Sequence, residues 1–193
     1  MLADEIAARG WCVTDRFVAS TLSRSLRDEA RSRWAKGAYH AAGIGAGRSP
    51  AVRSDVRGDH IVWLEPQGAS PAQQACLARF EGLRLALNRT LQLGLFDFEC
   101  HFTVYPAGAR YVRHLDRFKG DTRRALSCVL YLNAHWRTED GGQLRLYLDE
   151  GHWMDVLPES GTLVAFLSER FEHEVLPARR ERLSLTGWFR RRG

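Results

Sequence analysis

In the second half of this chain hydrophobic residues recur at every second position, and this spacing limits the possible fold more than any other feature. From residue 98 onward, short alternating runs are separated by Gly, Pro, Asp and Asn. The runs are FECHFTVY at 98–105, ALSCVLYL at 125–132, QLRLYL at 143–148, GTLVAF at 161–166 and LSLTGWF at 183–189. No helical pattern between them is long enough for a βαβ crossover, so they predict an antiparallel sandwich or jelly roll.

Two segments in the first half have apolar residues at helical spacing, and we expect both helices to buttress the β-rich half. We place the first between an N-cap at Ser20 and Gly37, and the second between an N-cap at Ser70 and Gly94. Their apolar faces consist of Leu22, Leu26, Ala30 and Trp34 in the first, and Ala72, Cys76, Phe80, Leu83, Leu87 and Leu91 in the second.

These patterns predict a single α+β domain over residues 1–193. Residues 1–97 supply helical support and a loop, and residues 98–193 form a double-stranded β-helix (jelly roll) core. The loop, at 40–59, is rich in small, polar and turn-forming residues, and we expect it to cover a site.

Composition limits the location and the partners of the protein. The first ten residues, MLADEIAARG, lack the apolar stretch of a signal peptide or a membrane helix, so we expect a cytoplasmic protein without a membrane partner. The formal charge of +5 and the arginines at 190–192 could favour nucleic acid, but such an excess more often belongs to a solvated surface. The four cysteines form no CxxC pair, which indicates neither a disulfide framework nor a zinc ribbon.

Three residues have the chemistry and the spacing of a metal site. His114 and Asp116 are two residues apart, so in an extended segment their side chains leave the same face about 7 Å apart along the backbone. His173 lies in a second short segment after a strand-like run. Two histidines and one carboxylate leave three metal positions open, which lets iron(II) bind a cosubstrate and oxygen together. An HxD pair is also common by chance, and a histidine in a strand is more often structural.

An arginine in an apolar strand strengthens the metal hypothesis. Arg182 begins the run RLSLTGWF, and burying its guanidinium without an anion would be unfavourable. The dicarboxylate 2-oxoglutarate would chelate iron through its keto-acid end and offer its far carboxylate to Arg182. The hydroxyl of Tyr131 could complete this pocket, although an aromatic residue that only fills the core would show the same pattern.

The same stretches resemble the catalytic core of the 2-oxoglutarate-dependent prolyl hydroxylases, particularly the oxygen-sensing group and its bacterial relatives. The resembling segments are VRGDHIVWLE at 56–65, YPAGARYVRHLD at 105–116, RALSCVLYLNAHW at 124–136, GGQLRLY at 141–147 and HEVLPARRERLSLTGWF at 173–189. This resemblance covers about two thirds of the chain and implies an enzyme that uses iron(II), 2-oxoglutarate and O2, with turnover sensitive to ascorbate as reductant and release of succinate and carbon dioxide.

The resemblance also implies a role for individual residues. It assigns iron binding to His114, Asp116 and His173, and binding of the far carboxylate of 2-oxoglutarate to Arg182 and Tyr131. Tyr105 is implied to line the cosubstrate pocket. Further matching positions lie near the substrate entrance or the loop that closes over it, namely Arg57, Asp59, Arg124 and Trp188.

The expected substrate is a prolyl residue in a protein, hydroxylated at C4. Bacterial relatives suggest a translation factor, such as the elongation factor that carries aminoacyl-tRNA. Three alternatives stay open on sequence alone: a free amino acid or short peptide as substrate, nucleic-acid demethylation by the same iron chemistry, and a non-catalytic metal-binding module of the same fold. The oligomeric state is not determined by the sequence.

Overall fold

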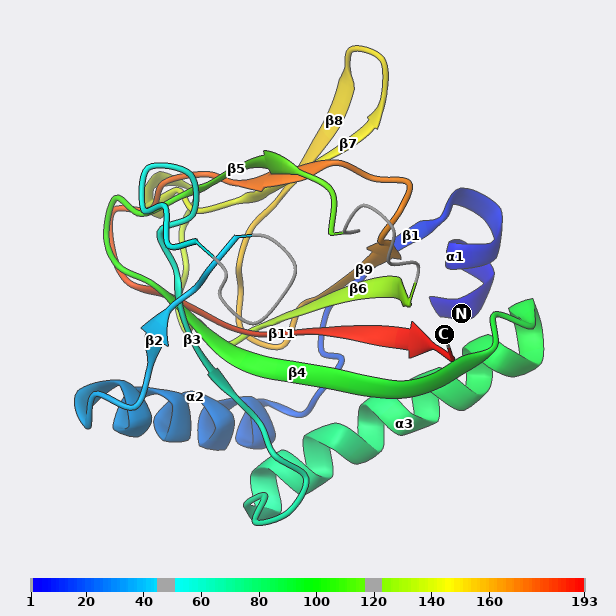
Figure 1. Ribbon diagram of the computed structural model, residues 1–193, viewed down its shortest axis with the longest axis horizontal. Helices are drawn as coiled ribbons and strands as arrows, with labels where there is room; N and C mark the ends of the chain where they lie inside the picture. The colour runs from blue at the N-terminus through cyan, green and yellow to red at the C-terminus, as the bar shows by residue number, and fades with distance from the viewer. Residues whose placement is uncertain (1, 45–50, 117–122, 193) are drawn as a thin grey trace.

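Two antiparallel sheets face each other in the computed structural model, which describes residues 2–44, 51–116 and 123–192 (Figure 1). The larger sheet has the order β1 (Trp11–Thr14), β9 (Leu163–Leu167), β6 (Arg124–Tyr131), β11 (Arg182–Arg191), β4 (Leu95–Tyr105), β3 (His60–Trp63) and β2 (His40–Ala41). The smaller sheet has the order β5 (Tyr111–His114), β10 (His173–Val175), β7 (Leu144–Asp149) and β8 (His152–Val156). This arrangement confirms the predicted jelly-roll fold class.

Helices cover the outer face of the larger sheet. Figure 1 shows α2 (Ser20–Ala35) and α3 (Pro71–Leu91) along this face, and α1 (Leu2–Arg9) lies near the N-terminal end of β1. A short 3-10 helix spans Thr138–Asp140. In the part of the chain that the structure describes, no helix is long and apolar enough to cross a membrane.

The predicted cap is correct for α3 and wrong for α2. The side chain of Ser70 accepts a hydrogen bond of 3.1 Å from the backbone N–H of Gln73, which satisfies one free donor of the first turn. In α2 the N-cap is Ala19, and Ser20 is already the first helical residue. The sequence pattern favoured Ser20 because it is the hydroxyl residue nearest the apolar spacing, but the chain leaves its extended conformation one residue earlier.

A row of small residues crosses the larger sheet on its helix-facing side. The strand registers place Cys12, Ala165, Cys128, Gly187 and Cys100 side by side on β1, β9, β6, β11 and β4. The cysteines are free and buried, so they fill this layer as small hydrophobic residues. This row leaves space for the large side chains of α3 and β4, where the rings of Phe80 and Phe98 stack at 4.3 Å.

The first half of the chain contributes strands as well as helices. β1, β2 and β3 all belong to the larger sheet, so the sheet crosses the division that we expected at residue 98. Each of these strands has at most four residues, which is too short to show a period of two. Their conformation depends on pairing with β9 and β4, which are distant in the sequence.

Candidate active site

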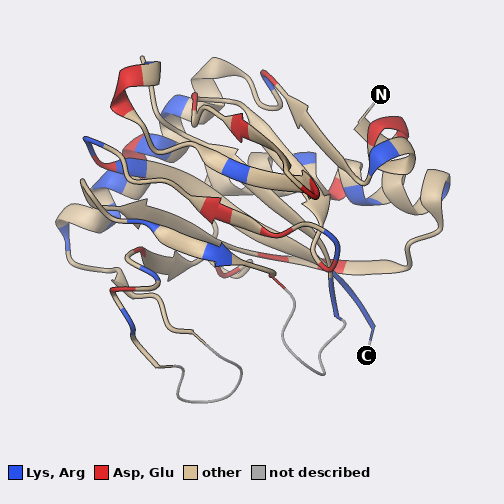
Figure 2. Cartoon of the chain, turned by 90° about the horizontal axis from the view of Figure 1, so that it is seen from above, with Lys and Arg blue, Asp and Glu red and all other residues tan. Residues whose placement is uncertain are grey.

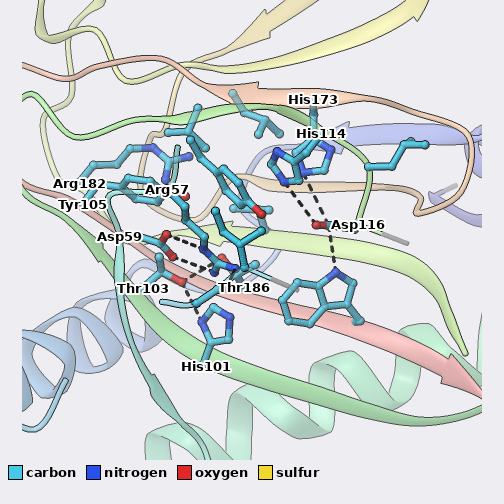
Figure 3. A pocket seen from close by; sticks show the side chains of 18 of the residues that line it. Arg57, Asp59, His101, Thr103, Tyr105, His114, Asp116, His173, Arg182 and Thr186 are labelled. Atoms are coloured by element: carbon cyan, nitrogen blue, oxygen red, sulfur yellow. Dashed lines mark hydrogen bonds and ion pairs between the residues drawn. The ribbon is translucent and has the colours of Figure 1, made fainter. Parts of the chain in front are cut away.

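The space between the sheets brings the three predicted metal ligands together. β5 ends at His114 and β10 begins at His173, and the antiparallel register places these two residues opposite each other. Asp116 follows two residues after His114. One ligand atom from each side chain lies within 4.8 Å of the others, and Figure 3 shows both rings turned toward the carboxylate. The separation of about sixty residues between His114 and His173 is therefore closed by strand pairing.

Backbone carbonyls orient both imidazole rings. The Nδ1 atom of His114 is 2.7 Å from the carbonyl oxygen of Val112, and that of His173 is 3.3 Å from the carbonyl oxygen of Phe171. Because a carbonyl only accepts, Nδ1 carries the proton in each ring and the Nε2 lone pair faces Asp116. Burial lowers the pKa of His173 to about 4, although Asp116 opposes this shift. The His173 ring is therefore a neutral donor at neutral pH, as a metal ligand must be.

Two hydrogen-bond donors hold the Asp116 carboxylate. Its Oδ2 atom accepts from Ser127 Oγ at 2.7 Å and from Trp188 Nε1 at 2.9 Å. Burial raises the pKa of Asp116, but His173 and His114 in their charged forms and the Ser127 hydroxyl lower it, and this pKa lies well below its usual range. The carboxylate is therefore charged and fixed in direction. Trp188, which the resemblance placed near the substrate entrance, also contacts the metal cluster.

Arg182 lines the other end of the cavity, and Tyr131 is buried beside it. Arg182 is 1% exposed, and its Nε donates to the carbonyl oxygen of Gly142 at 2.9 Å. Among the described residues, its Nη2 and the hydroxyl of Tyr131 have no hydrogen-bond partner. Burial raises the pKa of Tyr131 to about 12 against the opposing charge of Arg182, so the phenol keeps its proton. Two unpaired donors in a buried position fit one carboxylate of a dicarboxylic acid.

A cavity of about 270 Å³ connects these two ends. Its floor follows β4 and β11, where Arg182 lies opposite Tyr105 and Thr186 lies opposite His101. The guanidinium carbon of Arg182 is 5.2 Å from the centre of the Tyr105 ring, so Tyr105 forms one wall of the polar end. Apolar side chains of Val129, Leu144 and Val175 also line the cavity.

The remaining predicted residues also line the cavity, and of these Asp59 and Trp188 are buried. Arg57 and Asp59 form a two-bond ion pair with distances of 2.7 and 3.0 Å, and the Arg57 guanidinium lies 4.8 Å from the centre of the Tyr111 ring. On another side, the guanidinium of Arg124 is 3.5 Å above the centre of the Trp188 ring. Neighbouring side chains therefore fix the planes of both guanidinium groups.

The comparison with known proteins fits this geometry. Residues 100–190 match the 2OG-Fe(II) oxygenase superfamily. A crystal structure of a Pseudomonas putida prolyl-4-hydroxylase is 50% identical, with a TM-score of 0.92, and the match covers 100% of this chain and 98% of that chain. The chain belongs to the prolyl hydroxylase-like 2OG-Fe(II) oxygenases. It is therefore an oxidoreductase that uses iron(II), 2-oxoglutarate and O2.

More distant relatives share the domain. Human Egl nine homolog 1 is 30% identical over 191 residues, which cover 93% of this chain and 43% of that protein. This chain therefore spans less than half the length of that relative. A prolyl hydroxylase in complex with a hypoxia inducible factor peptide fragment from Trichoplax adhaerens is 25% identical, with a TM-score of 0.84, and the match covers 98% of this chain and 87% of that chain.

Sequence reasoning missed several cavity residues of this oxygenase. The missed cavity residues are His101, Thr103, Tyr111 and Thr186, and Ser127, which donates to Asp116, was missed as well. A signal was present, because polar residues alternate with apolar ones along β4 and β11 although both strands lie in the core. A period-two row of polar side chains in a central strand indicates an interior polar cavity as well as a strand.

Proposed function

We propose that this chain hydroxylates C4 of a prolyl residue in a protein, with iron(II) held by His114, Asp116 and His173. One observation carries the proposal: a single cavity joins a two-histidine, one-carboxylate cluster to the buried Arg182. The Arg182 guanidinium lies 5.0 Å from the ring centre of the buried Tyr131, and among the described residues both side chains have a polar atom without a hydrogen-bond partner. The family assignment and the similarity to prolyl hydroxylases support the reaction and the choice of substrate residue.

The polar end of the cavity would hold the far carboxylate of 2-oxoglutarate. Arg182 and Tyr131 supply donors to its oxygens, and Tyr105 closes one side of the pocket. The fixed direction of the guanidinium, set by its bond to Gly142, selects a planar anion at this depth. Bound iron(II) supplies the oxidising chemistry, in which one oxygen atom of O2 enters the substrate and the other enters succinate as carbon dioxide is released.

The protein itself contributes orientation and the exclusion of water. Ser127 and Trp188 fix the Asp116 carboxylate, so that the ligand set keeps one geometry before anything binds. Apolar residues around the cluster reduce the access of water to the reacting atoms. The arrangement therefore favours reaction with an enclosed C–H bond over side reactions with solvent.

The remaining polar lining residues would bind the prolyl substrate. Arg57 and Arg124 are partly exposed and would contact a peptide chain, while the buried Asp59 and Trp188 hold the two guanidinium groups in place. Part of the predicted covering loop at 40–59 also reaches the cavity, through Gly43 and Ile44, and its residues 45–50 lie outside the described residues. A closing motion of this loop stays a prediction.

The positions of the terminal arginines weaken the alternative that the protein acts on nucleic acid. Figure 2 shows basic residues at the C-terminal end of β11. Arg190 forms ion pairs with Asp97 and Glu99, and Arg192 lies 4.4 Å from the centre of the Phe96 ring. Arg191 Nε donates to the carbonyl oxygen of Leu93 at 2.9 Å, so all three side chains already have partners within the protein.

Succinate formation followed by mass spectrometry tests the proposal. The protein is incubated with iron(II), 2-oxoglutarate and ascorbate, which we propose as the reductant, with and without a bacterial lysate. We expect the lysate to stimulate turnover and one lysate protein, such as a translation factor, to gain the mass of one oxygen atom on a proline. A mass gain on free proline or on a nucleobase would show that this molecule, and not a protein, is the substrate. Binding of metal and 2-oxoglutarate without any turnover would favour the non-catalytic alternative.

The cytoplasmic location stays a prediction.

A further inference from the structure

Thr186 lies on the cavity floor between the two ends of the site. On β11, Arg182 comes four residues earlier and Trp188 two residues later, and in a strand all three side chains leave the same face. Arg182 belongs to the polar end of the cavity, whereas Trp188 donates to Asp116 at the metal end. Thr186 is partly exposed and lines the cavity. A ligand that reaches from Arg182 to the metal must therefore pass over the Thr186 hydroxyl.

Two hydrogen bonds connect this hydroxyl to a buried histidine on β4. Thr103 Oγ1 donates to Thr186 Oγ1 at 3.2 Å, and the same Thr103 oxygen is 2.9 Å from Nδ1 of His101 (Figure 3). A threonine hydroxyl has only one proton to donate. Since Thr103 gives its proton to Thr186, the bond between His101 and Thr103 requires a proton on Nδ1 of His101.

The surroundings of His101 fix its ring and its charge. The ring is 1% exposed and lies between two indoles, with its centre 4.9 Å from that of Trp63 and 5.5 Å from that of Trp188. Burial lowers the pKa of His101 to about 3, despite the opposing charge of Asp59. The ring is therefore neutral at neutral pH and carries a single proton, which the hydrogen-bond chain places on Nδ1.

We propose that His101 and Thr103 are positioning residues, which direct the Thr186 hydroxyl proton into the cavity to donate to an oxygen of bound 2-oxoglutarate. Thr186 accepts from Thr103, so its own proton can turn either to Ser184, whose Oγ is 3.3 Å away, or to the cavity. A carboxylate oxygen of the cosubstrate is the stronger acceptor. This inference rests on the proposed use of the cavity for 2-oxoglutarate, and it assigns a function to three residues that contact neither the metal ligands nor Arg182 by hydrogen bonds.

The tautomer of His101 gives a test that does not depend on activity. Protein with ¹⁵N-labelled histidine is loaded with zinc(II), which substitutes for iron without paramagnetism, and is examined by NMR with and without 2-oxoglutarate. We expect the ring nitrogens of His101, assigned from the His101→Asn spectrum, to show a protonated Nδ1 in both states. A proton on Nε2 would reverse the chain, because Thr103 would then donate to His101, and it would overturn the proposal.

Calorimetric binding of 2-oxoglutarate to the zinc(II)-loaded protein tests the donor itself. Thr186→Val keeps the shape but removes the hydroxyl, and we expect an affinity loss of about tenfold, the usual effect of one hydrogen bond to a charged group. Thr186→Ser keeps the hydroxyl and should keep the affinity. Thr90→Val, an exposed change on α3, is the matched control.

Two His101 variants separate positioning from packing. Asparagine can place an amide N–H at the position of Nδ1, so His101→Asn should bind 2-oxoglutarate within about threefold of the unchanged protein, whereas His101→Leu should lose about as much affinity as Thr103→Val. Zinc(II) affinity should stay constant in all of them. Unchanged 2-oxoglutarate affinity in Thr186→Val would refute the donor. No binding by the unchanged protein would instead refute the proposed function on which this inference rests.

Discussion

At the residue scale, the site depends on a few polar side chains that are buried at an energetic disadvantage until ligands bind. Arg182 and Tyr131 are the clearest cases, since both are buried and both have donor atoms without partners among the described residues. Unpaired buried donors destabilise a folded protein by about 1–3 kcal/mol each. Such an arrangement is retained only where a ligand uses it, which is why Arg182 was identifiable from sequence.

Arg182 should control the affinity for 2-oxoglutarate and not the affinity for metal. We expect Arg182→Ala to weaken 2-oxoglutarate binding at least tenfold, because a charge-assisted pair of about 1.5–3 kcal/mol is lost. Arg182→Lys should lose less, since it keeps the charge without the planar fork. Calorimetry with zinc(II)-loaded protein measures both affinities. Equal losses of metal and 2-oxoglutarate would contradict the separate roles of the two ends.

The donors to Asp116 should tune the metal affinity. His173→Ala should abolish tight metal binding, whereas Ser127→Ala and Trp188→Phe should each weaken it about tenfold by releasing the carboxylate. Trp153→Phe is a matched control, because Trp153 is 52% exposed on β8. Metal titration measures all four variants. If Trp188→Phe binds metal as the control does, the hydrogen bond has no orienting role.

At the element scale, β4 and β11 serve both the core and the site. Their helix-facing side chains pack against α3, and their opposite side chains form the cavity floor. The two functions alternate residue by residue, because side chains in a strand point alternately to its two faces. A change on the helix-facing side can therefore alter stability while the cavity residues stay unchanged in sequence.

Gly187 on β11 gives a test of this close packing. A Cβ at this position would lie 2.5 Å from the carbonyl oxygen of Glu99 and 2.6 Å from the ring of Phe98. We expect Gly187→Ala to lower the free energy of unfolding by at least about 1 kcal/mol, because overpacking a core costs about 1–3 kcal/mol. Gly82→Ala on α3, where a Cβ meets nothing within 4 Å, should instead stabilise by about 0.5–1 kcal/mol. Urea unfolding compares them, and similar losses in both would contradict this explanation.

At the scale of the whole molecule, two buried neutral histidines link folding to pH. The pKa of His101 is lowered to about 3 and that of His173 to about 4, in both cases mainly by burial. In the unfolded chain both would titrate near 6.5. Between these values the unfolded state binds protons that the folded state does not, so the folded state loses stability as the pH falls.

We therefore expect the free energy of unfolding of the metal-free protein to decrease from pH 7 to pH 4. Each histidine contributes at most about 1.4 kcal/mol per pH unit within this window. Urea unfolding at several pH values measures the slope, and His101→Asn should reduce it. Thr90→Val, an exposed change on α3 that removes no titrating group, should leave it unchanged. A slope that His101→Asn does not change would show that His101 is protonated equally in both states.

The sequence by itself determined the fold class, α3 with its cap, the strands β4, β6, β7, β9 and β11, and the residue types of the site. These features follow from local periodicity and from side chains whose burial needs a ligand, and both can be recognised in a linear chain. Only the tertiary structure decided that β1, β2 and β3 complete the larger sheet, since strands this short depend on partners distant in sequence. It alone showed that Ser127 and Trp188 hold Asp116, and that His101, Thr103 and Thr186 share one cavity floor, because a hydrogen bond between strands depends on register, which is set by the pairing of the whole sheet.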